Sequence, residues 1–160
     1  MSRQPRPALR PGRALRVAAL AALLALASGC AGKLLGKGTL HVTLTATPDC
    51  NSCGRPTGYP LTFRVLQVTD ASAITGMSLT QLWDKEDKLL GAAFLDKKES
   101  FIDPGETKEL PVERKPGAVA MIVVGNFCRS RGSCWFYAQS LARGGSVKLV
   151  AGADCLSAAK

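Results

Sequence analysis

The chain alternates between apolar and polar side chains after position 38, and this period of two constrains the fold more than any other feature. Successive side chains of a β-strand point to opposite faces of a sheet, so the alternation is typical of a strand with one buried face. In the segment 39–47 the expected buried face is Leu40, Val42, Leu44 and Ala46, and the expected exposed face is Thr39, His41, Thr43 and Thr45.

Further segments with strand character follow, separated by turns that contain Pro or Gly. They are 61–68, 99–102, 107–113, 118–127, 134–141 and 146–151. The segment 118–127 is almost entirely apolar, which predicts a central strand covered on both faces. Asp103-Pro104-Gly105-Glu106 favours a type II turn between two of the strands. About seven strands with short connections indicate an all-β protein, a two-sheet β-sandwich.

The pattern becomes helical between the second and third expected strands, at about residues 70–95. Ser78 and Gln81 are spaced as a capping box, in which each side chain binds the other's backbone N–H at the start of a helix. Leu79, Leu82 and Trp83 then share one helical face. The segment 89–95 is predicted to add another helical turn. The domain 39–160 is therefore expected to be a β-sandwich with a small helical insertion after strand two.

The N-terminal segment 1–29 is predicted to be a secretory signal peptide. The apolar stretch 17–27 has eleven residues and follows an arginine-rich start. As a helix it would rise about 16 Å, roughly half of a bilayer core, which is too short for a stable membrane span. A positive region followed by a short apolar one is typical of secretion signals. The arginines are Arg3, Arg6, Arg10, Arg13 and Arg16.

The residues that follow, Leu26-Ala27-Ser28-Gly29-Cys30, resemble the lipobox of bacterial lipoproteins. This resemblance implies that the Cys30 thiol carries diacylglycerol, that the signal peptide is removed before Cys30, and that the new amino group is acylated. Ala31 follows where an inner-membrane retention signal often has Asp, which implies the outer membrane. Residues 30–38 would be a lipidated tether. Two anchoring groups hold a protein stably on a bilayer, whereas one acyl chain does not.

The positive charge does not indicate a nucleic-acid partner. The net charge of the chain is +9, but residues 1–29 contain five arginines and no acidic residue. The remaining residues contain 16 Lys and Arg against 12 Asp and Glu, which is a net charge of +4. The excess of positive charge therefore belongs mainly to the signal peptide.

Five cysteines remain after Cys30, namely Cys50, Cys53, Cys128, Cys134 and Cys155. An exported chain meets an oxidising compartment, so disulfides are expected, and the odd count leaves one cysteine unpaired or paired with another chain. Following the strand directions from the tether brings all five to the end of the sandwich far from the membrane. The favoured pairing is Cys128 with Cys134, and Cys155 with Cys50 or Cys53.

The Cys50-Asn51-Ser52-Cys53 motif has two alternative interpretations, redox activity and metal binding. A redox motif of this type needs a helix after its first thiol, and here Gly54, Arg55 and Pro56 precede a strand. A zinc site would need a second such motif or a histidine pair. A structural disulfide is therefore favoured, with no metal and no cofactor beyond the lipid on Cys30.

No set of side chains predicts catalysis, so the protein is not expected to be an enzyme. His41 is the only histidine and lies on a polar strand face. Glu86 and Asp87 are expected to be solvated at a charged helix end, and Trp83 and Trp135 are expected to belong to the core.

The order of these features resembles the TssJ family, the outer-membrane lipoproteins of the type VI secretion membrane complex. The resemblance covers roughly residues 39–150, and no single motif carries it. Its pieces are the lipobox Cys30, the Thr-rich first strand, Arg55-Pro56 before the segment 60–68, Asp70-Ala71-Ser72-Ala73, Leu82-Trp83-Asp84, Leu90-Gly91, Pro104-Gly105-Glu106, Asn126-Phe127 and Trp135. The five later cysteines are not part of that pattern.

This resemblance implies a transthyretin-like sandwich with a structural role. Such a lipoprotein hangs from the outer membrane and binds the periplasmic domain of TssM, which is anchored in the inner membrane. With TssL, the pair forms a trans-envelope channel. The contact is attributed to the loop 48–59, and the expected partner-binding residues are Asp49, Asn51, Ser52, Arg55, Thr57 and Tyr59.

Two other functions remain as alternatives on the sequence. One is a generic periplasm-facing lipoprotein that binds a small ligand or pilots assembly. The other, less favoured, is a thiol-redox protein.

Overall fold

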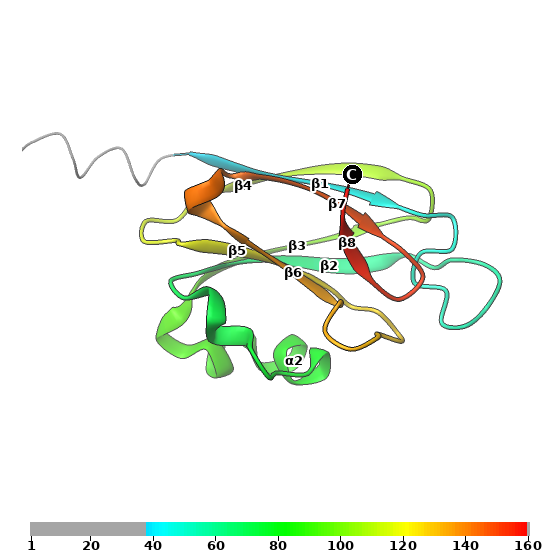
Figure 1. Cartoon of the computed structure of the whole chain (residues 1–160), viewed down its shortest axis with the longest axis horizontal. Helices are drawn as coiled ribbons and strands as arrows, with labels where there is room; N and C mark the ends of the chain where they lie inside the picture. The colour runs from blue at the N-terminus through cyan, green and yellow to red at the C-terminus, as the bar shows by residue number, and fades with distance from the viewer. Residues whose placement is uncertain (1–37, 160) are drawn as a thin grey trace, which may run out of the picture. The chain divides into compact units, whose positions relative to one another are not determined.

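Two four-stranded sheets pack face to face in the computed structural model, which describes residues 38–159 (Figure 1). The strand orders are β4-β1-β7-β8 and β3-β2-β5-β6. The predicted signal peptide, Cys30 and most of the predicted tether lie outside the described residues. The β-sandwich expected from the alternation is confirmed, with eight strands in place of about seven.

The first sheet contains β1 (Thr39–Ala46), β4 (Thr107–Glu113), β7 (Ser146–Ala151) and β8 (Leu156–Ala158). β1 pairs antiparallel with β4 and parallel with β7. The predicted alternation in β1 is confirmed, because Leu40, Val42, Leu44 and Ala46 are all buried. β8 was not predicted, since three residues are too few to show a period.

The second sheet contains β2 (Leu61–Val68), β3 (Phe94–Ile102), β5 (Ala120–Gly125) and β6 (Phe136–Ser140). β5 lies between β2 and β6, and all six of its residues are buried, so the prediction of a central, doubly covered strand is confirmed. β3 begins at Phe94, whereas the sequence placed the strand at 99–102. It is an edge strand with a largely solvated charged run, so its alternation is weak in the sequence.

The helical insertion lies between β2 and β3. It contains two 3-10 helices, η1 (Ala71–Ile74) and η2 (Gly91–Ala93), around α2 (Leu79–Leu90). The capping box is present, since Ser78 N donates to Gln81 Oε1 (3.0 Å) and Gln81 N donates to Ser78 Oγ (3.3 Å). Figure 1 shows these helices beside the β3-β2-β5-β6 sheet, on the side away from the other sheet. A third 3-10 helix, η3 (Leu141–Arg143), connects β6 to β7.

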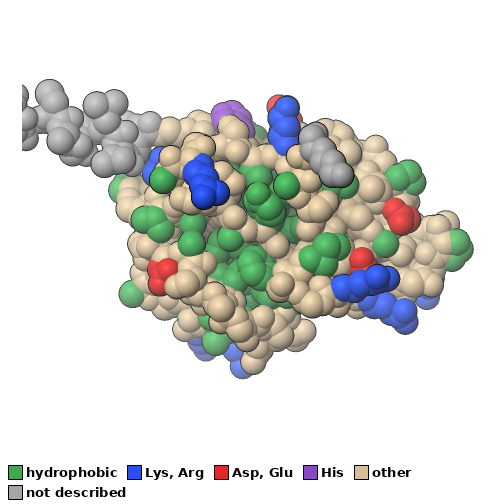
Figure 2. Space-filling view, viewed as in Figure 1, with side chains coloured by type: hydrophobic (Ala, Val, Ile, Leu, Met, Phe, Trp, Pro, Cys, Tyr) green, Lys and Arg blue, Asp and Glu red, His purple; other side chains and the backbone are tan. Residues whose placement is uncertain are grey.

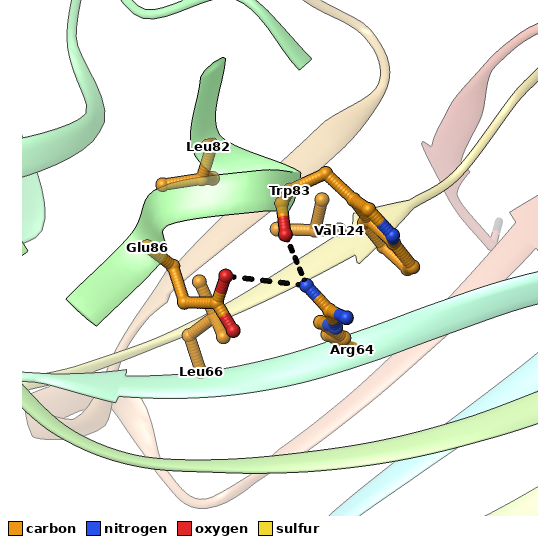
Figure 3. A pocket seen from close by; sticks show the side chains of 6 residues that line it. All are labelled: Arg64, Leu66, Leu82, Trp83, Glu86 and Val124. Atoms are coloured by element: carbon orange, nitrogen blue, oxygen red, sulfur yellow. Dashed lines mark hydrogen bonds and ion pairs between the residues drawn. The ribbon is translucent and has the colours of Figure 1, made fainter. Parts of the chain in front are cut away.

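Glu86 of α2 is buried, so the prediction that it is solvated is wrong. It lies one helical turn before Leu90, which is also buried, and after a kink at Lys85 (φ −143°, ψ 31°) that interrupts α2, so it lies on the buried face of the second part of the helix. Arg64 of β2 compensates its charge, with Nη1 3.2 Å from Glu86 Oε2 (Figure 3). Lys97 of β3 also pairs with Glu86. Asp87 is exposed, as expected.

Trp83 packs over the same arginine. The Arg64 guanidinium lies 3.9 Å from the Trp83 ring centroid, and Arg64 Nη1 donates to the Trp83 carbonyl oxygen (2.6 Å). Figure 3 shows Leu82, Leu66 and Val124 beside this group, with the helix above the sheet. Trp83 is partly buried against the core, and Trp135 is buried, in agreement with the core role predicted for both.

Four loops meet at one end of the sandwich, which we call the loop end: 47–60, 103–106, 126–135 and 152–155. Backbone hydrogen bonds connect them, from Gly105 to Ala46 (3.1 Å), from Asn51 to Gly152 (3.1 Å) and from Leu156 to Cys134 (2.8 Å). Figure 1 shows these loops on the right, and the start of β1 at the opposite end. The strand-direction argument that gathered the five cysteines at one end is therefore confirmed.

Candidate functional site

The loop 47–60 is compact because its backbone folds back on itself. Cys50 N donates to the Thr47 carbonyl oxygen (2.9 Å), and Tyr59 N donates to the Cys50 carbonyl oxygen (2.8 Å). Gly58 passes close to this turn, and a β-carbon there would lie 2.6 Å from the Pro48 carbonyl oxygen. A larger residue at position 58 would therefore force the loop open.

Asn51 and Ser52, two of the expected partner contacts, are buried. The Asn51 side chain connects the loop 47–60 to the loop 126–135, because Nδ2 donates to the Pro60 carbonyl oxygen at the end of its own loop (3.0 Å) and Oδ1 accepts from Cys128 N (3.0 Å). Ser52 N donates to the Ala153 carbonyl oxygen (3.2 Å). These two residues hold the loop in place, and their side chains are not presented to solvent.

The other expected contacts lie at the surface of the loop. Asp49, Arg55 and Thr57 are exposed, and Tyr59 is partly buried. Arg55 Nη1 donates to the Tyr59 hydroxyl (2.6 Å), and the guanidinium carbon lies 5.6 Å from the Tyr59 ring centroid. The loop therefore presents one cation and one aromatic ring in contact with each other. Asp49 accepts a hydrogen bond from Thr47 Oγ1 (2.6 Å).

Two disulfides cross the loop end, and they differ from the favoured pairing. Cys53 is bonded to Cys128 and Cys134 to Cys155, with Cα–Cα separations of 5.5 and 5.1 Å. The expected Cys128–Cys134 pair is wrong because the two ends of the loop 126–135 have different neighbours. Cys128 binds Asn51 in the first loop, whereas the Cys134 backbone pairs with Leu156 at the start of β8.

Cys50 is the one free cysteine among residues 38–159, and it is buried. Burial, and to a lesser extent the charge of Asp49, raise the pKa of the Cys50 thiol to about 11. Cys53, the second cysteine of the Cys50-x-x-Cys53 motif, is bonded to Cys128 and not to Cys50. The motif therefore lacks the paired thiols and the low thiol pKa on which thioredoxin-type chemistry depends.

His41 is exposed on β1, as predicted. In the part of the chain that the structure describes, no three His, Cys, Asp or Glu side chains are grouped so as to hold a metal ion. Within residues 38–159 there is also no helix with both the length and the apolar character needed to cross a membrane.

A charged group that was not expected from the sequence lies at the loop end and contains Arg129, Arg131 and Asp154. Arg131 Nε lies 2.5 Å from Asp154 Oδ2. The sequence contains a signal for this group, because Arg129 and Arg131 lie between Cys128 and Cys134 in a loop that was expected at this end. Charged side chains in a short loop are mostly exposed to solvent.

A family model of type VI secretion lipoproteins, described under the names VasD, EvfM and TssJ, matches residues 38–151. The match begins at the start of the sandwich and ends with β7. No curated protein matches the chain.

Several solved structures share the fold. Lip of Serratia marcescens, a membrane-bound component of the type VI secretion system, aligns with a TM-score of 0.68 at 19% identity over 76% of this chain and 97% of that chain. The lipoprotein TssJ1 of Pseudomonas aeruginosa aligns with a TM-score of 0.67 at 17% identity, and the alignment covers 77% of this chain and 95% of that chain. A chain in the structure of the TssM C-terminal domain from EAEC aligns with a TM-score of 0.68 at 14% identity, and the alignment covers 78% of this chain and 98% of that chain.

The two disulfides are expected to stabilise the fold unequally. The Cys53–Cys128 bond closes 75 residues and the Cys134–Cys155 bond 21. From chain entropy, replacing both Cys53 and Cys128 by Ser should lower the free energy of unfolding by about 4 kcal/mol. Replacing both Cys134 and Cys155 by Ser should lower it by about 3 kcal/mol. Urea unfolding of the two variants measures this. A non-reducing peptide map that joins Cys128 to Cys134 would contradict the assignment.

Cys50 is expected to resist alkylation in the folded protein. With a pKa of about 11, only about one thiol in a thousand is ionised at pH 8, and the thiolate is the reactive form. Iodoacetamide should leave a folded chain that begins at Ala31 unmodified at pH 8, react increasingly as the pH approaches 11, and modify one thiol in urea. Rapid modification of the folded chain at pH 8 would show that Cys50 is accessible and ionised.

Proposed function

The chain belongs to the TssJ family of type VI secretion lipoproteins, and we propose that it is the outer-membrane anchor of a type VI secretion membrane complex. In this proposal the lipid on Cys30 holds the domain on the periplasmic face of the outer membrane. The domain binds the periplasmic part of TssM, and together with TssL the pair spans the envelope. The match of the family to almost the whole sandwich supports this role.

The position of the lipid relative to the sandwich supports the orientation. Eight residues lie between Cys30 and Thr39, so the start of β1 stays within about 30 Å of the lipid. β1 then runs to Ala46 at the loop end. A partner that reaches across the periplasm from the inner membrane therefore meets the loop end before the rest of the domain.

The observation that carries the proposed contact is the Arg55–Tyr59 pair on the compact loop 47–60. Arg and Tyr are among the side chains that most often dominate the binding energy of an interface. A loop already held by Asn51 and by the Cys53–Cys128 bond has less conformational entropy to lose when a partner binds. Arg55, Thr57 and Tyr59 are therefore the proposed contacts, while Asn51 and Ser52 position them.

Removal of the lipidated cysteine is expected to abolish the anchoring. The Cys30→Ser variant should be exported, remain unacylated and fractionate with soluble periplasmic proteins, with loss of type VI secretion. Membrane fractionation and mass spectrometry of the mature N-terminus measure this. Retention of the variant in the outer-membrane fraction would contradict the anchor.

The double substitution Arg55→Glu with Tyr59→Ala is expected to weaken binding to the TssM periplasmic domain at least 100-fold, because both anchoring side chains are lost. Calorimetric titration of the soluble domain measures the affinity, and circular dichroism checks the fold. Deletion of 51–58 is a poorer test, since it also removes Cys53 and the buried Asn51.

A matched control changes another cation and another aromatic ring. His41→Ala with Lys148→Glu alters two exposed side chains of β1 and β7, away from the loop, and should bind TssM as the wild type does. Unchanged affinity of the Arg55→Glu, Tyr59→Ala variant would exclude this pair as the contact.

A further inference from the structure

A shallow cavity of about 300 Å³ lies at the junction of three loops of the loop end. Its lining residues come from the loops 47–60, 126–135 and 152–155, and five of the seven carry polar or charged side chains. The seven are Ser52, Gly54, Arg129, Ser130, Arg131, Ala153 and Asp154. Figure 2 shows Lys and Arg side chains gathered on this side of the molecule, at the lower right, where Figure 1 shows these loops.

The charges around the cavity do not balance. Two guanidinium groups line it, and Asp154 is the only carboxylate that does. Asp154 is engaged by Arg131, whose Nε lies 2.5 Å from its Oδ2. Within residues 38–159, Arg129 has no ion pair. The other acids of the loop end do not line the cavity, and two of them are engaged locally, Asp49 by Thr47 Oγ1 and Glu106 by Asp103 N.

Arg129 also lies close to the loop 47–60. Its guanidinium lies against the backbone of Gly54, where a β-carbon would be 2.5 Å from Nη1. Cys128, the residue before it, is disulfide-bonded to Cys53, the residue before Gly54. The bond therefore fixes the loop that carries Arg129 against the loop that carries Arg55, so that both exposed cations belong to one rigid surface.

We infer that Arg129 receives a carboxylate from an acidic segment of the protein partner, in the cavity where its loop meets the loop that carries Arg55. This inference rests on the proposed function, because it assigns a chemistry to the partner at the loop end. The planar guanidinium matches a carboxylate with two parallel hydrogen bonds. A doubly charged phosphate group fits less well, because the fixed carboxylate of Asp154 lines the same cavity.

The test compares variants of Arg129 in titrations against the TssM periplasmic domain. Arg129→Glu should weaken binding roughly 10- to 100-fold, because it replaces a charge-assisted contact with a repulsion. Arg129→Lys keeps the charge and should lose less. Raising the salt concentration from about 50 to about 500 mM should weaken wild-type binding more than that of Arg129→Gln. Arg143→Glu, a matched change in η3, should have no effect.

Charge reversal on the partner identifies the acidic group. An Asp→Lys or Glu→Lys substitution in TssM that restores the affinity of Arg129→Glu would establish the pairing. If the wild-type chain binds TssM and Arg129→Glu binds equally well, this inference is wrong and the proposed function stands. If the wild-type chain does not bind TssM at all, the proposed function itself fails. Binding to vesicles of anionic phospholipid that depends on Arg129 would overturn the assignment to a protein carboxylate.

Discussion

The burial of β5 on both faces is the constraint on which the rest of the sandwich depends. A strand in a two-layer sandwich normally has one face in the core and one in water, but all six residues of Ala120–Gly125 are buried. The outer face of its sheet must therefore be covered, and the insertion between β2 and β3 provides the cover. Once α2 lies on the sheet, Glu86 is buried together with Leu82 and Leu90, and Arg64 and Lys97 compensate the charge. Removing one partner of such a buried pair costs more than the pair contributes to stability, which favours keeping all of its members.

Besides the buried Phe127 and Trp135, the loop end is held by backbone hydrogen bonds, by the Asn51 side chain and by two disulfides. Two non-glycine residues of the loop 47–60, Asn51 (52°) and Cys53 (58°), have positive φ. Such backbone conformations persist where the surroundings enforce them. Here the Asn51 side chain, the backbone contacts with the loop 152–155 and the Cys53–Cys128 bond enforce them together. The same bond that stabilises the fold therefore determines where the exposed Arg55 and Arg129 lie.

This arrangement separates anchoring from recognition within a small domain. The proposed lipid site lies before β1, and the proposed partner surface lies at the opposite end of the strands, with the sandwich as a rigid spacer between them. Cys50 fits the same scheme as a buried thiol beneath the loop, where its raised pKa keeps it neutral. In the proposed function the loop end therefore binds the partner, and the disulfides Cys53–Cys128 and Cys134–Cys155 hold its loops together.

The sequence by itself determined most of the strands, because alternation, turn residues and the capping box act over a few residues at a time. It missed β8 and the first half of β3, whose alternation is absent or weak. It predicted β1, β2, β4 and β7 almost residue for residue, the helical insertion, and the single end at which the cysteines meet. Only the tertiary structure decided which cysteines pair, since Cys128 and Cys134 follow different neighbours across the loop end. It also decided that Asn51 and Ser52 are buried and that Glu86 is not solvated, because burial depends on which segment covers a residue. The position of Arg129 over Gly54 was likewise decided by the tertiary structure. Cys53 and Cys128, the residues that precede Gly54 and Arg129, are 75 positions apart in the sequence, and only folding brings them together.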